Sequence, residues 1–219
     1  MEARSRMPGG ILVAAILLGV SACATPQAAH EQGVPPAAPG GDGEQRQIAA
    51  LKASLQTLQT SESAGRTGTL KGVGTINVSP APPLLLATSS FSLIPSTPDL
   101  EALLDQIGRA WREGRRRPVS NPEFQAAFGL LDRHVLAVRA LGGGAFIREA
   151  QSDDKGGFTF DNVPEGRWLL VTELQTPVSA LVWAIRGRVI VGKTTFVKVS
   201  ETNVWIEGHR SASDEKRTP

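Results

Sequence analysis

The stretch from Ser152 to Val171 constrains the fold more than any other part of the chain. Its sequence is Ser-Asp-Asp-Lys-Gly-Gly-Phe-Thr-Phe-Asp-Asn-Val-Pro-Glu-Gly-Arg-Trp-Leu-Leu-Val, a pattern typical of turn, strand, turn and strand. The Asp and Gly residues favour tight turns, and Phe158-Thr159-Phe160 alternates apolar with polar side chains. Because strand side chains alternate with a period of two, Phe158 and Phe160 are predicted to share one buried face of a sheet.

This stretch resembles the signature of the carboxypeptidase regulatory-like domain, a transthyretin-like (prealbumin-like) β-sandwich. Ser152 stands where the family usually has Thr, and Trp168 stands where it usually has Tyr. The residues that carry the resemblance are Asp153, Gly157, Phe158, Phe160, Val163, Pro164, Gly166 and Trp168. The resemblance implies a mainly β fold, a Greek-key seven-strand sandwich over residues 69–208. It implies no particular reaction, because one fold hosts many functions.

The first residues of the chain have the composition of an export signal. Arg4 and Arg6 give a positive start, and the apolar run from Ile11 to Val20 is far shorter than the roughly 18 to 20 residues of a membrane span. The run ends in Val20-Ser21-Ala22-Cys23, which resembles the lipobox of bacterial lipoproteins. In that family the signal is removed and the cysteine is acylated. We therefore expect residues 1–22 to be a lipoprotein signal peptide and Cys23 to carry the lipid, palmitate included.

Cys23 is the single cysteine of the chain, so it cannot form an internal disulfide. Ala24 follows it, instead of the Asp that favours inner-membrane retention in the lipoprotein family. The resemblance thus implies a lipid anchor in the outer membrane, with the protein facing the periplasm or the cell surface. Such an anchor holds firmly, since each buried methylene contributes about 0.8 kcal/mol. The alternative is an ordinary secretory signal that is cleaved after Ala22.

Composition divides the rest of the chain into further segments. Residues 23–43 are rich in Ala, Pro and Gly and are predicted to form a flexible tether. Residues 44–62 are predicted to be helical, because the apolar residues are spaced three and four apart: Ile48, Leu51, Leu55 and Leu58. Two heptads are too few to establish a coiled coil, so this helix either supports a homo-oligomer through residues 44–60 or packs on the domain. The polar residues 209–219 are predicted to be a disordered tail.

A helical pair is predicted to interrupt the sandwich at about residues 97–141. Thr97 can cap the first helix and Pro98 suits its first position, while Asp99 and Glu101 favour its positive end. Its apolar stripe consists of Leu100, Leu103, Leu104, Ile107 and Trp111. The second helix is predicted to start at Asn121, with one face formed by Phe124, Phe128, Leu131 and Val135.

Strands are predicted on both sides of this insert. The expected strands near residues 70–78 and 84–95 precede it, and Leu85, Ala87, Phe91 and Leu93 are the inward candidates of the second. The expected strands after it begin with residues 145–151 and end with residues 204–206.

Neither nucleic acid nor nucleotide is predicted as a partner. The 23 Lys and Arg residues nearly balance the 21 Asp and Glu residues, which gives no concentrated basic surface for nucleic acid. The segment from Gly187 to Thr194 formally matches the phosphate-binding P-loop pattern. Its centre, Val189-Ile190-Val191, is a stiff β-branched run where a P-loop must be flexible. We expect a hairpin turn there.

No catalytic, cofactor or metal site can be assembled from the sequence. The three histidines, His30, His134 and His209, are scattered, and neither the zinc-carboxypeptidase nor the metalloprotease histidine motif occurs. The acidic turn residues around Asp153 and Asp161 lack the alternating spacing of a calcium-binding loop. The sequence therefore predicts a protein that is not an enzyme, with no cofactor and no metal.

These observations lead to one main hypothesis and two alternatives. The main hypothesis is a non-catalytic, lipid-anchored envelope protein whose β-sandwich is a structural or protein-interaction module with an envelope protein as partner. The first alternative is a lipoprotein that binds carbohydrate or peptidoglycan, which predicts an exposed tryptophan pair on a flat face. The candidates for that pair are Trp111, Trp168, Trp183 and Trp205. The second alternative is a hydrolase with a dispersed active site.

Overall fold

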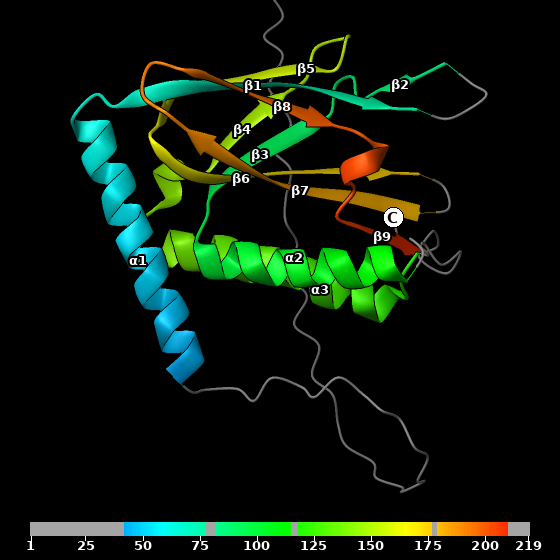
Figure 1. Cartoon of the computed structure of the whole chain (residues 1–219), viewed down its shortest axis with the longest axis horizontal. Helices are drawn as coiled ribbons and strands as arrows, with labels where there is room; N and C mark the ends of the chain where they lie inside the picture. The colour runs from blue at the N-terminus through cyan, green and yellow to red at the C-terminus, as the bar shows by residue number, and fades with distance from the viewer. Residues whose placement is uncertain (1–41, 78–81, 115–117, 177–178, 210–219) are drawn as a thin grey trace, which may run out of the picture. The chain divides into compact units, whose positions relative to one another are not determined.

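The computed structural model describes residues 42–77, 82–114, 118–176 and 179–209 (Figure 1). These residues belong to one compact unit, Pro39–Pro219. The predicted signal peptide, the lipidation residue Cys23, nearly all of the predicted tether and residues 210–219 of the predicted tail lie outside the described residues. Among the described helices, none is both long enough and apolar enough to cross a membrane.

Two β-sheets form the framework of the described region (Figure 1). The first sheet contains β1 (Thr67–Ile76), β2 (Leu84–Leu85), β5 (Gly157–Pro164) and β8 (Thr194–Val199). In this sheet β1 is central: it is antiparallel to β2 and β5 and parallel to β8. The second sheet is antiparallel throughout and has the strand order β4 (Arg148–Gln151), β3 (Ser90–Pro95), β6 (Gly166–Gln175), β7 (Ser179–Val189) and β9 (Ile206–His209).

Aromatic side chains from both sheets meet in the space between them. Phe158 on β5 stacks on Phe91 on β3, with ring centroids 4.1 Å apart and planes at 20°. Phe158 and Phe160 are each 4% exposed, so the prediction that they share one buried face is confirmed. Trp168 on β6 is fully buried. The sandwich interior is therefore apolar, as expected for two packed sheets whose inner residues alternate with outward ones.

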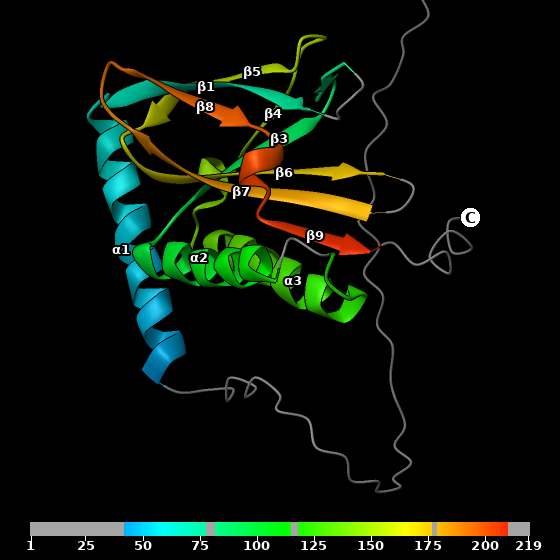
Figure 2. The ribbon, with the colours of Figure 1, turned by 45° about the vertical axis from the view of Figure 1, so that its right-hand side comes forward.

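The N-terminal helix α1 (Asp42–Ser63) packs on the sandwich and contacts β5, β6 and the helix α3 (Asn121–Ala140). Figures 1 and 2 show it running along one end of the sandwich. Leu51, Leu55 and Leu58 are 3%, 6% and 1% exposed, whereas Ile48 is 45% exposed. Of the two arrangements that its apolar spacing allowed, the helix thus adopts the one in which it packs on its own domain. The described structure contains a single chain, and the homo-oligomer remains a prediction.

The helical pair predicted near residues 97–141 consists of α2 (Pro98–Glu113) and α3. Both helices lie along the outer face of the second sheet (Figures 1 and 2). Thr97 caps α2 as predicted, because its Oγ1 accepts a hydrogen bond of 3.2 Å from Leu100 N. At the start of α3, the carboxylate of Glu123 accepts hydrogen bonds from the amide and the hydroxyl of Ser120. These bonds lower the pKa of Glu123.

The strand predictions need correction in number and in register. The described residues form nine strands instead of seven, partly because the segment 84–95 splits into β2 and β3. Between them Thr88 adopts a φ of +53°, a backbone conformation that residues other than Gly rarely take. The turn shifts the inward positions by one residue. Leu85 is 41% exposed and Leu86 is 2% exposed, so Leu85 was predicted wrongly, whereas Phe91 and Leu93 are fully buried as predicted.

Three further boundaries differ from the predictions. Part of the predicted strand 145–151 is a 3-10 helix, η1 (Gly144–Phe146), which precedes β4. The last predicted strand, 204–206, is displaced toward the C-terminus, because a second 3-10 helix, η2 (Glu201–Asn203), precedes β9. Consequently β9 includes His209, the first residue of the predicted tail.

Within the segment from Gly187 to Thr194, residues 190–193 form a turn as predicted, but the turn does not form a hairpin. It joins the end of β7 in the second sheet to the start of β8 in the first sheet, where β8 pairs with β1. The segment that follows the turn is a strand, whereas a P-loop leads into a helix.

Candidate functional site

Each signature residue of the turn and strands from Ser152 to Val171 has a structural role. Asp153 Oδ1 accepts hydrogen bonds from Lys155 N at 2.8 Å and from Gly157 N at 2.7 Å, which closes the turn. Val163, Pro164 and Trp168 are buried, and the indole of Trp168 donates to the Pro164 carbonyl at 3.0 Å. Asp153, Gly157, Val163, Pro164 and Trp168 thus serve the fold.

The four tryptophans do not form a ligand platform. Trp111 is 7% exposed and Trp205 is 4% exposed, while Trp168 and Trp183 are fully buried. The indole of Trp183 donates to Ser200 O and that of Trp205 to Leu104 O, each at 2.8 Å. All four tryptophans belong to the described residues, so the exposed pair required by a tryptophan-based carbohydrate site is missing.

The histidines are not brought together. His134 on α3 is half-buried, and its Nε2 donates to the carbonyl of Pro95 at the end of β3, at 2.8 Å. Burial lowers the pKa of His134. His30 lies outside the described residues, and His209 ends β9. Within the described part of the chain, no three His, Cys, Asp or Glu side chains lie close enough together to hold a metal ion.

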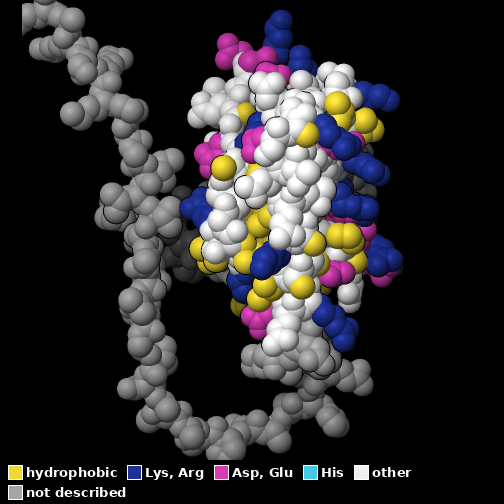
Figure 3. Space-filling model, turned by 90° about the vertical axis from the view of Figure 1, so that its left-hand side faces the viewer, with side chains coloured by type: hydrophobic (Ala, Val, Ile, Leu, Met, Phe, Trp, Pro, Cys, Tyr) yellow, Lys and Arg dark blue, Asp and Glu magenta, His cyan; other side chains and the backbone are white. Residues whose placement is uncertain are grey.

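A groove of about 840 Å³ lies between α1 and the second sheet, and we call it the arginine groove. Its lining includes side chains from α1, from the turn after α1, from the β3–α2 connection, from β6 and from β7. The lining residues used below are Ser54, Arg66, Ser96, Glu165, Arg167 and Arg188. Figure 3 looks onto α1, and Lys and Arg side chains gather along one border of that face.

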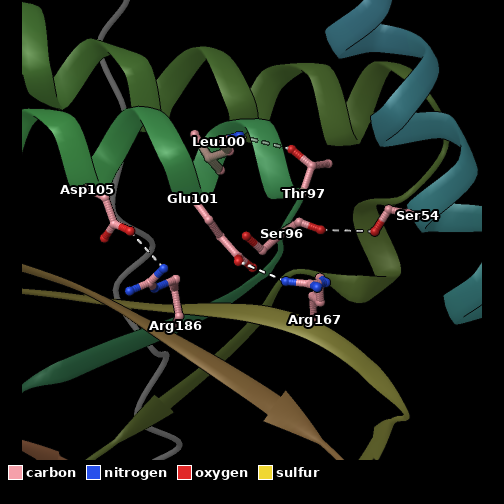
Figure 4. Close-up of polar contacts among 8 residues, drawn as sticks. All are labelled: Ser54, Ser96, Thr97, Leu100, Glu101, Asp105, Arg167 and Arg186. Atoms are coloured by element: carbon pink, nitrogen blue, oxygen red, sulfur yellow. Dashed lines mark hydrogen bonds and ion pairs between the residues drawn. The ribbon is translucent and has the colours of Figure 1, made fainter.

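Two ion pairs connect α2 to the sheet beside the arginine groove (Figure 4). Arg167 on β6 donates to Glu101 at 3.0 Å, and Arg186 on β7 donates to Asp105 at 2.8 Å. Glu101 and Asp105 are four residues apart and therefore lie on one face of α2. Glu101 is only 8% exposed. The sequence predicts only a helix-dipole role for Glu101, and its pairing with Arg167 on a distant strand is apparent only in the structure.

The three arginines of the groove differ in their partners. Arg167 has Glu101, and Arg66 contacts the carboxylate of Glu165. Arg188, which is exposed, has no acidic partner among the described residues. It lies directly opposite Arg167 in the β6–β7 pairing. Like charges in directly opposite positions destabilise a sheet, so this pair of arginines carries a cost.

Two serines link α1 to the start of α2 at the groove. Ser54 Oγ donates to Ser96 O at 3.0 Å (Figure 4). Ser96 is fully buried, and its own hydroxyl has no hydrogen-bond partner among the described residues. A buried hydroxyl without a partner costs free energy, typically about 1 to 3 kcal/mol. The hydroxyl of Ser96 is thus an unpartnered group in the interior beside the groove.

No protein-family model and no curated protein matches this chain. Two solved structures are similar to parts of it. A candidate carbohydrate-binding protein from Pseudomonas aeruginosa is 18% identical with a TM-score of 0.38, over 65% of this chain and 96% of the other. A pilus backbone protein from Streptococcus pneumoniae is 14% identical with a TM-score of 0.28, over 61% of this chain and 40% of the other. Neither likeness is close enough to indicate a function.

Proposed function

We propose that the protein is a lipid-anchored lipoprotein of the bacterial outer membrane whose β-sandwich is a non-catalytic structural or protein-interaction module. The observation that carries this proposal is Val20-Ser21-Ala22-Cys23, which ends a short apolar run after two arginines and contains the chain's single cysteine. The signature at Ser152–Val171 supports a carboxypeptidase regulatory-like domain. A seven-strand Greek-key core within the two sheets is part of the same proposal.

Burial of the tryptophans supports a structural module over a carbohydrate-binding one. A sugar ring stacks on an exposed aromatic face, whereas every tryptophan here is buried and three of the indoles donate to backbone carbonyls. The signature residues likewise fill the interior or close turns. A partner of this module would therefore contact the outer surfaces of the domain, and an envelope protein is the partner that an outer-membrane anchor places within reach.

Metabolic labelling tests the lipid anchor. The full chain is expressed in a bacterium that is fed a clickable palmitate analogue, beside the variant Cys23→Ser. We expect label and outer-membrane fractionation for the unchanged chain and loss of both for Cys23→Ser. Because Cys23 is the single cysteine, no second thiol can take the acyl group. An unlabelled, soluble product that starts at Cys23 would instead identify an ordinary secretory signal and overturn the anchor.

Two measurements test the module. Purified protein is incubated with panels of esters, peptides and glycans, and we expect no turnover above that of buffer. Turnover that increases with protein concentration and survives further purification would establish the hydrolase alternative. Crosslinking in intact cells followed by mass spectrometry is expected to recover an envelope protein, and the recovered peptides would show which face of the sandwich it contacts.

A further inference from the structure

We infer that the arginine groove binds an oxyanion, a carboxylate or phosphate group of a larger ligand, with Arg188 as its main contact and Arg66 and Arg167 beside it. This inference goes beyond the proposed module and does not depend on the lipid anchor. It rests on the charge of the groove, on the opposed arginines and on the lack of a described acidic partner for Arg188.

The groove carries an excess of positive charge. Three arginines line it, from the turn after α1, from β6 and from β7, and the acidic residue that lines it with them is Glu165. Glu165 is occupied by Arg66, and the nearby Glu101 is occupied by Arg167. The charge of Arg188 is therefore not compensated by a described acidic residue, and an anion would experience a net attraction there.

The position of Arg188 makes a bound anion useful to the fold. Arg167 and Arg188 lie opposite each other on neighbouring strands, so their guanidinium groups repel. Glu101 compensates one of the two charges, since it accepts from Arg167 at 3.0 Å. An oxyanion between the arginines would compensate the other. Guanidinium presents its donors as a planar fork that matches two oxygens of one carboxylate or phosphate group.

The hydroxyl groups around the groove are not available to a ligand. Ser54, Thr57 and Thr60 on α1 each donate to a backbone carbonyl, so their protons are already used. The unpartnered hydroxyl of Ser96 is fully buried, so a ligand in the groove does not reach it. The arginines would therefore supply the donors.

The size of the groove indicates more than a single ion. Its volume of about 840 Å³ falls within the roughly 300 to 1,000 Å³ that is typical of sites for small organic ligands. A bare phosphate or carboxylate would fill only part of this space. The oxyanion is thus one group of a ligand whose remaining atoms lie along α1, against small side chains such as Ala50 and Ala53.

Nuclear magnetic resonance of the arginine side chains tests this inference. The full mature chain is titrated with inorganic phosphate and, separately, with citrate, while sodium chloride keeps the ionic strength constant. We expect a saturable shift of the Arg188 Nε–Hε signal. A larger affinity for phosphate would identify a phosphate group as the ligand's anion, and a larger affinity for citrate would identify a carboxylate.

Variants separate a specific site from general screening. Binding by the variants is read from the Nε–Hε signals of Arg66 and Arg167, because the Arg188 signal is lost with its side chain. Arg188→Gln is expected to weaken binding about tenfold or more, because it removes charged hydrogen bonds. The affinity of Arg188→Lys for the anion is expected to lie between those of the unchanged chain and Arg188→Gln, since Lys keeps the charge but lacks the planar fork of donors. The matched control Arg139→Gln changes an exposed arginine of α3 outside the groove and should bind like the unchanged chain. Because Arg188 is exposed, unchanged thermal melting should show that its variants fold.

Two outcomes would overturn the inference. One is the absence of a saturable shift at anion concentrations below those at which sodium chloride alone moves the same signals. The other is equal weakening by Arg188→Gln and Arg139→Gln, which would show that the anions respond only to total charge. Neither outcome would affect the lipid anchor, because palmitate labelling of Cys23 is read independently.

Discussion

The interior of the sandwich and the helix-covered face of the second sheet are built from the same strands but from different interactions. On β6 the adjacent residues Arg167 and Trp168 point to opposite faces, since strand side chains alternate. Trp168 is fully buried, whereas the side chain of Arg167 is 51% exposed and pairs with Glu101. The interior side thus depends on apolar packing, and the helix side combines packing with ion pairs.

This difference indicates that the interior of the sandwich determines the fold, whereas the helix-covered face determines recognition. The interior uses the signature residues, which other proteins with this fold can share without sharing a function. The helix side is covered by α2 and α3 and bounded by α1, and its charged groups come from this chain's own insert and strands. Substitutions inside should therefore change stability, and substitutions on the helix side should change binding more than stability.

The largest effect is expected for Trp168→Ala in the interior. Loss of a fully buried tryptophan leaves a cavity and should lower the free energy of unfolding by about 3 to 5 kcal/mol. The control Phe196→Ala removes a ring on β8 that is 67% exposed. It should change the free energy of unfolding by less than about 0.5 kcal/mol. Urea unfolding followed by the fluorescence of the other tryptophans measures both. Similar losses for the two variants would contradict the assignment of inside and outside.

A smaller effect is expected at the signature turn. Gly156 has a φ of +76°, and a Cβ there would lie 2.5 Å from the carbonyl oxygen of Gly74 on β1. Gly142 has a similar φ of +79° with open space around it. Both alanine variants carry the strain of a left-handed residue, about 1 to 2 kcal/mol. Gly156→Ala should cost clearly more in the same urea experiment. Equal losses would show that the turn can move away from β1.

On the helix side, Glu101→Gln should lower the free energy of unfolding by about 1 to 2 kcal/mol. The loss stays below the roughly 3 to 5 kcal/mol of a fully buried pair, because half of the Arg167 side chain remains in water. Asp105→Asn breaks the more exposed pair with Arg186 and should cost less than about 1 kcal/mol. Thermal unfolding at low and high salt compares them. A larger loss for Asp105→Asn would reverse the ranking by burial.

The smallest effect concerns pH. Burial lowers the pKa of His134 below its usual 6.5, so the unfolded chain binds this proton more readily than the folded one. The stabilisation linked to neutral His134 is complete above about pH 6.5 and is lost as pH falls below that value. His134→Gln should remove this part of the pH dependence of unfolding. An unchanged pH profile would show that His134 does not contribute to it.

Local patterns in the sequence predicted local structure well. The helical pair followed from the spacing of apolar residues and, for the first helix, from the cap at Thr97, which depend only on neighbouring residues. The buried pair Phe158 and Phe160 followed from the period of a strand. The shift from Leu85 to Leu86 could not be predicted, because it depends on the positive φ of Thr88, which composition does not indicate.

The arginine groove could not be predicted from the sequence, because its residues come from elements far apart in the chain. Arg66 follows α1, Ser96 precedes α2, and Arg188 lies near the end of β7, so only the packing of α1 on the second sheet brings them together. From the sequence alone, Arg66, Ser96 and Arg188 cannot be distinguished from ordinary solvated surface residues. The pairing of Arg167 with Glu101 likewise requires the helix to cross the strand, which no local spacing determines.

The parallel pairing of β1 with β8 has a kinetic consequence. The first strand of the domain is paired with its second-to-last strand, so the first sheet cannot be completed until almost the whole domain has been synthesised. Closing so long a loop costs entropy before the contact repays it, and folds dominated by such pairings form slowly. Strand β1 therefore waits for its parallel partner through most of the synthesis of the domain, and the first sheet is completed later than the pairing of β3, β4, β6 and β7 in the second sheet.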